Sequence, residues 1–245
     1  MRVSLSSAIF MLIIVFTCNA QQDMDSIKRM NVYLIHGQGS DSRLFKNLSF
    51  DERFLIKNIS LPIPEKQYSM KQYAAEVLKS INTDEPCALI GVSLGGMVCT
   101  ELADLHDFKK IIIVSSAKCR SELPLLYRFQ KYLPLKSLVP GFLFKVFSRV
   151  LQPIIEPDRR KEKETCRAML KDKKGIFLKR TSNLIVKWDR KNFSSKIIHI
   201  HGTNDHTLPG RIINANYWIT NGSHMMILTQ SEGINSIITG ILSDF

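Results

Sequence analysis

The sequence predicts an α/β protein in which helices cover both faces of a mostly parallel central sheet. Short apolar runs of four or five residues recur along the chain, and each ends at a glycine or a polar loop. Longer segments with apolar residues at helical spacing separate these runs. Strands that are apolar throughout and alternate with helices are typical of parallel sheets buried on both faces. The 245 residues suit one domain with a substantial core.

The first predicted strand and helix are separated by a long polar connection. Residues 31–35 are an apolar run that stops at a glycine loop, which is typical of a buried strand. Ser69 and Gln72 have the spacing of a capping box, in which each side chain satisfies an orphan backbone amide. Apolar residues at helical spacing follow as far as Ile81, and they predict a helix there.

The remaining predicted elements continue the alternation of strands and helices. A strand, a helix and another strand come before a long insertion. Two more strands follow the insertion, and a helix with an isoleucine stripe closes the chain. The predicted elements are the strands 87–90, 111–114, 196–200 and 215–219 and the helices 94–106 and 231–242. Parallel sheets of this kind place their ligands at the carboxyl ends of the strands.

The first 20 residues have the pattern of a secretory signal peptide. Arg2 precedes an apolar run at residues 8–16, and small residues from Cys18 to Ala20 end it at the spacing of a cleavage site. The run is too short to span a bilayer comfortably. The pattern predicts a secreted or periplasmic protein. Retention of the segment as an anchor and lipidation of Cys18 are the alternatives.

Residues 119–191 break the alternation, because they hold no clear strand and five prolines divide them into short helical pieces. We interpret them as a basic helical insertion between two parts of the core, residues 30–118 and 192–245. At the carboxyl edge of the sheet, such an insertion would lie over the ligand site as a lid. Residues 118–191 carry 20 of the 34 basic and 7 of the 22 acidic residues. This charge suits a solvated surface, or contact with an anionic lipid surface or an acidic substrate. We expect no nucleic-acid binding, because no stacking aromatics alternate with the charges.

Four cysteines remain once Cys18 leaves with the signal peptide. Cys87 and Cys99 lie in apolar segments and are expected to be buried as small hydrophobic side chains. Cys119 and Cys166 could pair in an oxidising compartment, and the sequence leaves that question open.

The motif Gly91-Val-Ser93-Leu-Gly95 follows a predicted strand and opens a predicted helix. In this setting the serine sits on a sharp turn, and the glycines avoid clashes with the adjacent strand and helix. Ser93 is therefore the candidate nucleophile. The alternative is a glycine-rich packing turn with an idle serine.

A serine hydroxyl needs a base, and the base needs an acid to hold its tautomer. Of the six histidines, His224 is best placed, because it follows the last strand and precedes the closing helix. Asp205 follows another strand at a turn, whereas Asp158 and Asp189 lie in the insertion and lack a strand end. An ordinary Asx turn is the alternative role of Asp205.

The order Ser93, Asp205, His224 resembles that of the α/β-hydrolase superfamily, in which nucleophile, acid and histidine follow successive strands. The resemblance covers residues 30–117 and 192–245, and the insertion takes the position of that family's lid. The first predicted strand matches the third strand of the family. The resemblance therefore implies a shortened sheet that lacks two strands and has one open edge.

The same resemblance assigns an oxyanion hole. His36-Gly37-Gln38-Gly39 is similar to the family's loop after its third strand, which donates one amide to the developing oxyanion. This implies the Gln38 backbone N–H as one donor and that of Leu94 as the other, with His36 and Gly37 supporting the loop. Each donor would contribute about 3 kcal/mol. The alternative for His36 and Gly37 is a tight turn.

These residues imply a serine hydrolase that cleaves a carboxylic ester through an acyl-enzyme on Ser93, with no metal or organic cofactor. His199 and His201 share a strand face and could bind a metal with His206, but no carboxylate-rich ligand set accompanies them. A thioesterase, lipase or peptidase would use the same triad, as would a lyase or an acyl transferase. A binding protein without turnover is a further alternative, although a binder has no need of all three groups.

The insertion indicates the kind of substrate. Residues 123–155 are both apolar and basic, which suits either an interfacial helix or an apolar face that covers the core and lines an acyl pocket. We favour the second interpretation. In both cases the expected substrate is a small-molecule ester with an apolar acyl group. Residues 162–174 are charge-dense and are typical of a solvated helix.

Overall fold

The structure is a computed structural model that describes residues 29–130, 146 and 157–243. Its strands are β1 (Met30–Ile35), β2 (Phe54–Ile59), β3 (Cys87–Val92), β4 (Lys110–Val114), β5 (Ile197–Gly202) and β6 (Tyr217–Ile219). Its α-helices include α2 (Met70–Leu78), α3 (Leu94–Leu102), α4 (Leu125–Phe129), α6 (Lys163–Asp172), α7 (Gly175–Lys187), α8 (Met226–Thr229) and α9 (Ser231–Leu242). The 3₁₀ helices are η1 (Ser42–Phe45), η2 (Arg120–Glu122), η4 (Pro157–Glu162) and η5 (Gly210–Ile212). The segment interpreted as a signal peptide lies outside the described residues.

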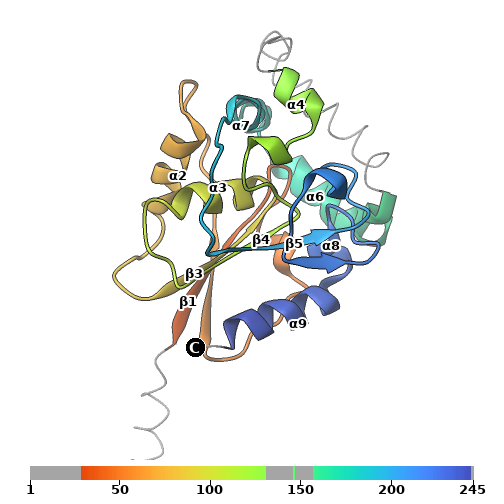
Figure 1. Cartoon of the computed structure of the whole chain (residues 1–245). Helices are drawn as coiled ribbons and strands as arrows, with labels where there is room; N and C mark the ends of the chain where they lie inside the picture. Colours follow the sequence, from red (N-terminus) through yellow and green to blue (C-terminus); the bar gives the residue numbers. More distant parts are fainter. Residues whose placement is uncertain (1–28, 131–145, 147–156, 244–245) are drawn as a thin grey trace, which may run out of the picture.

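The six strands form one sheet in the order β2-β1-β3-β4-β5-β6, and every neighbouring pair is parallel. The predicted fold class is confirmed (Figure 1). β2 was not among the predicted strands. β2 is an edge strand, and within the described residues no further strand pairs with its outer side, as expected for a shortened sheet.

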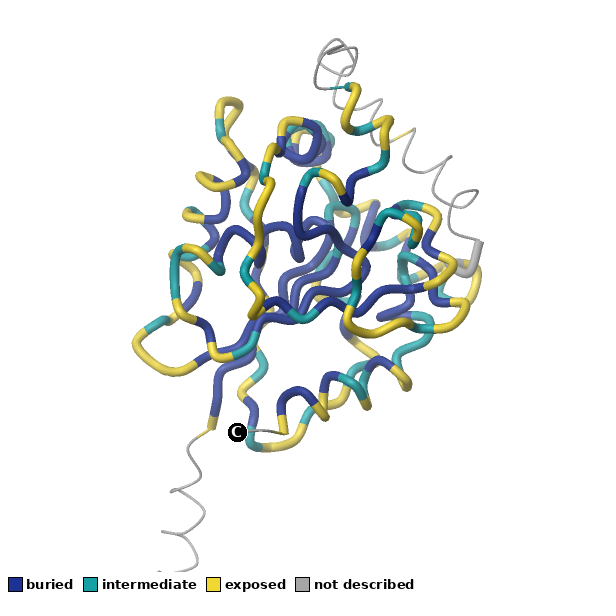
Figure 2. Tube along the Cα trace, in the orientation of Figure 1, coloured by how far each residue is buried: buried dark blue, intermediate teal, exposed yellow. Residues whose placement is uncertain are grey.

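Each face of the sheet carries its own hydrophobic cluster, because successive strand residues point to opposite sides. In β1, Tyr33 and Ile35 belong to one cluster and Val32 and Leu34 to the other. The first cluster includes side chains of α2, α3 and α7, and the second includes side chains of α8 and α9. In Figure 1, α2 and α3 lie on one side of the sheet and α9 lies on the other. The inner strands β1, β3, β4 and β5 are therefore largely buried, whereas exposed residues lie on the edge strands β2 and β6, in the loops and on the outer helix faces (Figure 2).

Local signals in the sequence account for most element boundaries. The capping box is confirmed, because Ser69 Oγ accepts from the Gln72 N–H and the Gln72 side chain accepts from the Ser69 N–H. α3 ends at Leu102 rather than at residue 106, since tighter turn-type bonds such as Leu105 N to Leu102 O follow it. β6 is also shorter than predicted, because the Asn216 side chain bonds the β5 backbone at the N–H of His199.

The described part of the insertion is helical, and its apolar residues do not all cover the core. Tyr127 of α4 packs against the first cluster, but Leu125, Leu126 and Phe129 are 61%, 68% and 62% exposed. The prediction that the apolar face of the insertion covers the core is therefore wrong for α4. Of its apolar side chains, Leu125, Leu126 and Phe129 are exposed to solvent. Most of residues 131–156 lie outside the described part. In the residues that are described, no helix is both long and apolar enough to cross a membrane.

The pairing of Cys119 with Cys166 that the sequence left open does not occur. Both thiols are free and buried, as are those of Cys87 and Cys99. Cys166 packs in the second hydrophobic cluster, whereas Cys119 Sγ lies 3.1 Å from the hydroxyl of Ser121 in the turn after β4. Cys119 and Cys166 therefore lie in different parts of the structure.

Candidate active site

Ser93 lies on a strained turn between β3 and α3. Its backbone has φ 53° and ψ −118°, a region that non-glycine residues rarely adopt. The glycines of the motif permit this turn. A Cβ on Gly91 would lie 2.5 Å from the carbonyl oxygen of Gly95, and a Cβ on Gly95 would overlap the carbonyl oxygen of Ile35. The serine is thus presented at the carboxyl edge of the sheet by a tight backbone contact between β1 and α3.

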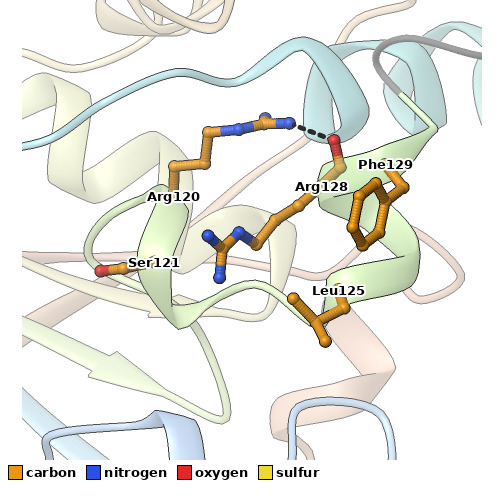
Figure 3. Close-up of a pocket in the computed structure, with 5 residues that line it drawn as sticks. All are labelled: Arg120, Ser121, Leu125, Arg128 and Phe129. Carbon is orange, nitrogen blue, oxygen red and sulfur yellow. Dashed lines mark hydrogen bonds between the residues drawn. The ribbon is translucent and has the colours of Figure 1, made fainter.

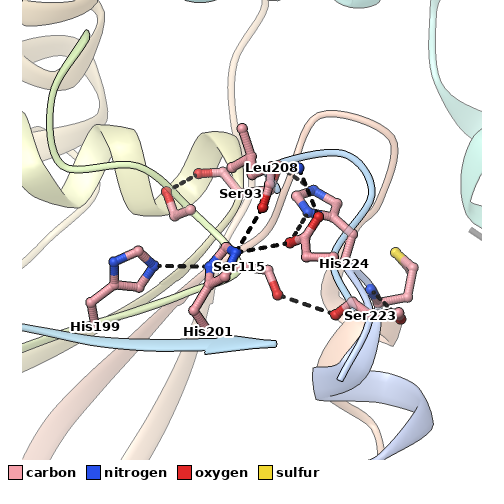
Figure 4. Close-up of polar contacts among 10 residues, drawn as sticks. Ser93, Ser115, His199, His201, Leu208, Ser223 and His224 are labelled. Atoms are coloured by element: carbon pink, nitrogen blue, oxygen red, sulfur yellow. Dashed lines mark hydrogen bonds and ion pairs between the residues drawn. The ribbon is translucent and has the colours of Figure 1, made fainter. Parts of the chain in front are cut away.

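The structure brings Ser93, His224 and Asp205 together at this edge. Ser93 Oγ lies 2.9 Å from Nε2 of His224, and Nδ1 of the same ring lies 2.8 Å from Oδ2 of Asp205 (Figure 4). A carboxylate accepts the Nδ1 proton, so Nε2 keeps its lone pair and accepts the Ser93 hydroxyl proton. The imidazole is therefore in the tautomer that a general base requires.

Asp205 is buried and held by several polar contacts. Oδ1 accepts the backbone N–H of Leu208 at 2.7 Å, and the side chain is 0% exposed. Burial raises the pKa of the Asp205 carboxyl, but the charge and hydrogen bond of His224, with smaller contributions from His201 and the Leu208 N–H, lower it below the usual value overall. The carboxylate is ionised at neutral pH and can stabilise an imidazolium at His224.

Two further histidines of β5 extend this polar row, because His201 lies beside Asp205 and His199 contacts His201 (Figure 4). His201 Nε2 donates to the Leu208 carbonyl at 2.9 Å and lies 3.6 Å from Oδ2 of Asp205. Because Nε2 carries the proton, Nδ1 of His201 accepts from His199 Nε2 at 3.2 Å. Burial is the main cause that lowers the pKa of both rings, so both are neutral at neutral pH. The sequence singled out this pair only as an alternative metal site, and their role beside Asp205 was not predicted.

The structure does not place His206 beside His199 and His201, as the alternative metal site requires. His206 is exposed, and its Nε2 lies 3.0 Å from the side-chain oxygen of Asn204 rather than beside His199 and His201. Among the described residues, no group of three or more histidine, cysteine or carboxylate side chains is arranged to hold a metal ion.

The loop after β1 lies beside Ser93, where the resemblance places an oxyanion hole. A Cβ on Gly37 would be 3.2 Å from Cβ of Ser93, so only a small residue permits this approach. Leu94 begins α3, where the first N–H groups of a helix have no intrahelical acceptor. In the part of the chain that the structure describes, neither the Gln38 nor the Leu94 backbone N–H donates to a backbone carbonyl. Both amides are therefore available to a ligand atom near Ser93.

His36 shapes the same loop from inside the protein. Its Nδ1 lies 2.7 Å from the carbonyl oxygen of Gly37, and the imidazole is buried. Burial, reinforced by the positive charge of Lys173, lowers the pKa of His36 to about 4. The ring is neutral at neutral pH and donates its Nδ1 proton to the loop.

A separate pocket of about 280 Å³ lies in the first part of the insertion (Figure 3). Leu125 and Phe129 of α4 give it apolar walls, and Arg128 and Arg120 line it as well. The Arg120 guanidinium is already used, because it donates to backbone carbonyls that include those of Arg128 and Val186. This pocket contains none of the residues around Ser93.

The sheet and the loops at its strand ends have the α/β-hydrolase fold. The sheet is parallel, the serine lies on a strained strand–helix turn, and the histidine and the acid follow the last two strands. A family model described as uncharacterised protein family UPF0227 matches residues 31–123, which include β1 to β4 and the Ser93 turn. Among curated proteins no match is found.

Solved structures of the same fold are similar along nearly the whole chain. A thermophilic esterase from Thermogutta terrifontis is 16% identical with a TM-score of 0.60, over 89% of this chain and 90% of that chain. MenH from S. aureus is 15% identical with a TM-score of 0.67, over 88% and 94%. A structure from a study of carboxylesterases of Nitrososphaera gargenis is 14% identical with a TM-score of 0.65, over 89% and 91%. At these identities the likeness establishes the α/β-hydrolase fold.

Proposed function

We propose that this protein is a serine hydrolase that cleaves a carboxylic ester with an apolar acyl part through an acyl-enzyme on Ser93. The observation that carries the proposal is the hydrogen-bonded row from Ser93 Oγ through the His224 imidazole to the Asp205 carboxylate, with distances of 2.9 and 2.8 Å. The esterases among the structures of the same fold support the same class of reaction.

In the proposed mechanism, His224 Nε2 takes the proton of Ser93 as Oγ attacks the ester carbonyl carbon. The carbonyl oxygen becomes an oxyanion that accepts hydrogen bonds from the backbone N–H groups of Gln38 and Leu94. Asp205 stabilises the imidazolium through Nδ1. The imidazolium then gives its proton to the departing alcohol, and the acyl group remains on Ser93.

Deacylation repeats these steps with water as the nucleophile. His224 takes a proton from water, the hydroxide attacks the acyl carbonyl, and the same two amides receive the second oxyanion. The proton then returns to Ser93 Oγ, and the carboxylic acid leaves. The chain's own side chains and backbone amides supply every group that these steps use.

Fluorophosphonate labelling tests the proposed nucleophile directly. We expect the native protein to gain one covalent adduct, located on Ser93 by peptide mass spectrometry, because its hydroxyl is activated by His224. The variant Ser93→Ala should gain none. Ser236→Ala is a matched control, since Ser236 lies exposed on α9 and its hydroxyl donates to the Glu232 carbonyl of the same helix.

The proposal would be wrong if the Ser93→Ala variant were labelled as fast as the native protein. A panel of p-nitrophenyl esters then tests the acyl preference. Values of kcat/KM that rise from acetate to longer chains support an apolar acyl group, and values that fall contradict it. Products formed with excess alcohol separate hydrolysis from acyl transfer.

A further inference from the structure

The side chain of Gln38 leaves its own loop and contacts α7 of the insertion. Its Nε2 lies 2.8 Å from each of three acceptors on that helix, which are the carbonyl of Leu178 and the hydroxyls of Thr181 and Ser182. These partners are 140 or more residues away along the chain. A side-chain amide has two N–H donors, so the three acceptors use its full donor capacity.

α7 is a firm support for this contact. Phe177, Leu178 and Leu184 of the helix are buried in the first hydrophobic cluster. Thr181 is fully buried, and its hydroxyl donates to the Phe177 carbonyl at 2.7 Å, which leaves an oxygen lone pair directed toward Gln38. Hydrogen bonds to buried partners of this kind hold a side chain in place, because water does not compete for the acceptors.

The peptide bond that carries the Gln38 N–H is held from its other end. The Gly37 carbonyl belongs to this peptide, and it accepts from His36 Nδ1 at 2.7 Å and from the Ser40 hydroxyl at 3.3 Å. A planar trans peptide directs its N–H opposite to its C=O. The Gln38 N–H therefore points away from His36 and Ser40, on a loop whose Gly37 lies against Ser93.

We propose that the Gln38 side chain ties the oxyanion-hole loop to α7, so that the insertion helps to aim the Gln38 backbone N–H at the reacting carbonyl oxygen. This inference rests on the proposed function and extends it. Gln38 then has two separate roles, because its backbone N–H binds the oxyanion and its side chain positions that N–H. α7 acts through Gln38 and needs no contact with the substrate.

The proposal predicts a loss in kcat rather than in KM. Removing a complete oxyanion donor typically lowers kcat about 100- to 1,000-fold. Loosening a donor that is still held at the Gly37 carbonyl should lower kcat less, by about tenfold. KM should change less than about twofold, because the donor acts on charge that develops after the substrate has bound.

The variants Gln38→Ala and Gln38→Met test this, because both keep the backbone N–H and remove the contact with α7. A second route is the double variant Thr181→Val with Ser182→Ala, which removes two acceptors on the helix itself. It should lower kcat by a smaller factor, since the Leu178 carbonyl remains. In a Gln38→Ala background the same two substitutions should cause no further loss, because they act through one contact.

The readouts are kcat and KM for p-nitrophenyl butyrate and the inhibition constant of an alkyl boronic acid, whose adduct on Ser93 mimics the tetrahedral intermediate. We expect boronic-acid affinity to fall with kcat in the Gln38 and α7 variants. Ser236→Ala is the control for removing a helical hydroxyl, and it should leave kcat unchanged. If the Gln38 variants do not fold, the α7 variant alone decides.

Three results would overturn the proposal. A folded Gln38→Ala or Gln38→Met variant with native kcat would show that the contact with α7 does not position the Gln38 backbone N–H. A rise in KM with native kcat would make the side chain a substrate contact instead. If native protein neither turns over esters nor labels at Ser93, the proposed function fails, and this inference fails with it.

Discussion

Replacing Asp205 by asparagine should disable the base while leaving the shape of the site unchanged. Oδ1 of Asp205 accepts the Leu208 N–H at 2.7 Å, so the amide oxygen of an asparagine must take that position. The amide NH₂ then takes the place of Oδ2, which is 2.8 Å from Nδ1 of His224. An NH₂ group can only donate, so Nδ1 must accept, and the imidazole proton moves to Nε2. A protonated Nε2 facing Ser93 cannot take the serine proton.

The size of the effect follows from the tautomer change. Forcing the inactive tautomer in a serine–histidine–aspartate triad typically lowers kcat about 10⁴-fold. That factor corresponds to about 5 kcal/mol of transition-state stabilisation. The measurement is kcat/KM for p-nitrophenyl butyrate at pH 7, together with the rate of fluorophosphonate labelling at Ser93. Both should fall together, because both depend on removing the serine proton.

Asp189→Asn is the matched control, because the same substitution is made at an exposed aspartate of the insertion. It should change kcat/KM by less than about twofold, as surface substitutions usually do. Thermal unfolding should show that both variants are folded. If the Asp205→Asn variant kept more than about a tenth of native kcat/KM, the assignment of Asp205 as the acid partner would be refuted.

Two further predictions concern stability. Gly95→Ala should lower the free energy of unfolding by about 3 kcal/mol or more, because the added Cβ would overlap a backbone oxygen. Gly240→Ala on α9 should raise it by up to about 1 kcal/mol, because nothing lies within 4 Å of the added Cβ. Urea denaturation measures both changes, and equal effects of the two substitutions would contradict the packing argument. For His36, burial lowers the pKa to about 4, so between pH 6.5 and 4 the unfolded chain binds more protons than the folded protein. The free energy of unfolding should therefore fall as the pH falls through this range. His36→Asn keeps an N–H for the Gly37 carbonyl but does not titrate, so denaturation at pH 7 and 4 should show a fall smaller by about 3 kcal/mol than in the native protein. An equal fall in both would contradict burial of a neutral imidazole.

The strands could be predicted where burial on both faces made them apolar throughout. β1, β3 and β4 are of this kind, and their residues are almost all buried. β2 was missed because it lies at the edge of the sheet, and within it only Phe54 and Ile59 at its two ends are buried. Lys57 and Asn58 interrupt its apolar pattern, and at an edge such polar residues face solvent without cost. An edge strand therefore gives a weak signal in a search for apolar runs.

Some residues of the candidate site could be predicted from local sequence patterns, whereas contacts between distant residues could not. Ser93 could be found because a strained turn between a strand and a helix needs glycines at fixed spacing. The contact of Gln38 with α7 could not be found, because it joins residues 140 or more positions apart and follows no local pattern. The position of His201 beside Asp205 has a local origin, since the chain turns back after β5. The sequence showed that His199 and His201 share a face but not what they face.

The end of β4 explains how groups from non-adjacent strands meet. β4 lies between β3, which precedes Ser93, and β5, which precedes Asp205, so about 10 Å of sheet separates those two strands. The imidazole of His224 spans this gap, because one ring nitrogen contacts Ser93 and the other contacts Asp205. Directly after β4 the backbone leaves the strand conformation at Ser115, whose φ is 46°.

Two small residues at this turn support both sides of the gap. The Ser116 hydroxyl donates to the Ser93 carbonyl at 2.7 Å, and the Ser115 hydroxyl lies 3.5 Å from the carbonyl of Ser223, the residue before His224. Ser115 and Ser116 are both fully buried, so a larger side chain at either position would have to displace the segments that carry Ser93 or His224. The distance between Ser93 and His224 is thus set partly by the two residues that follow β4.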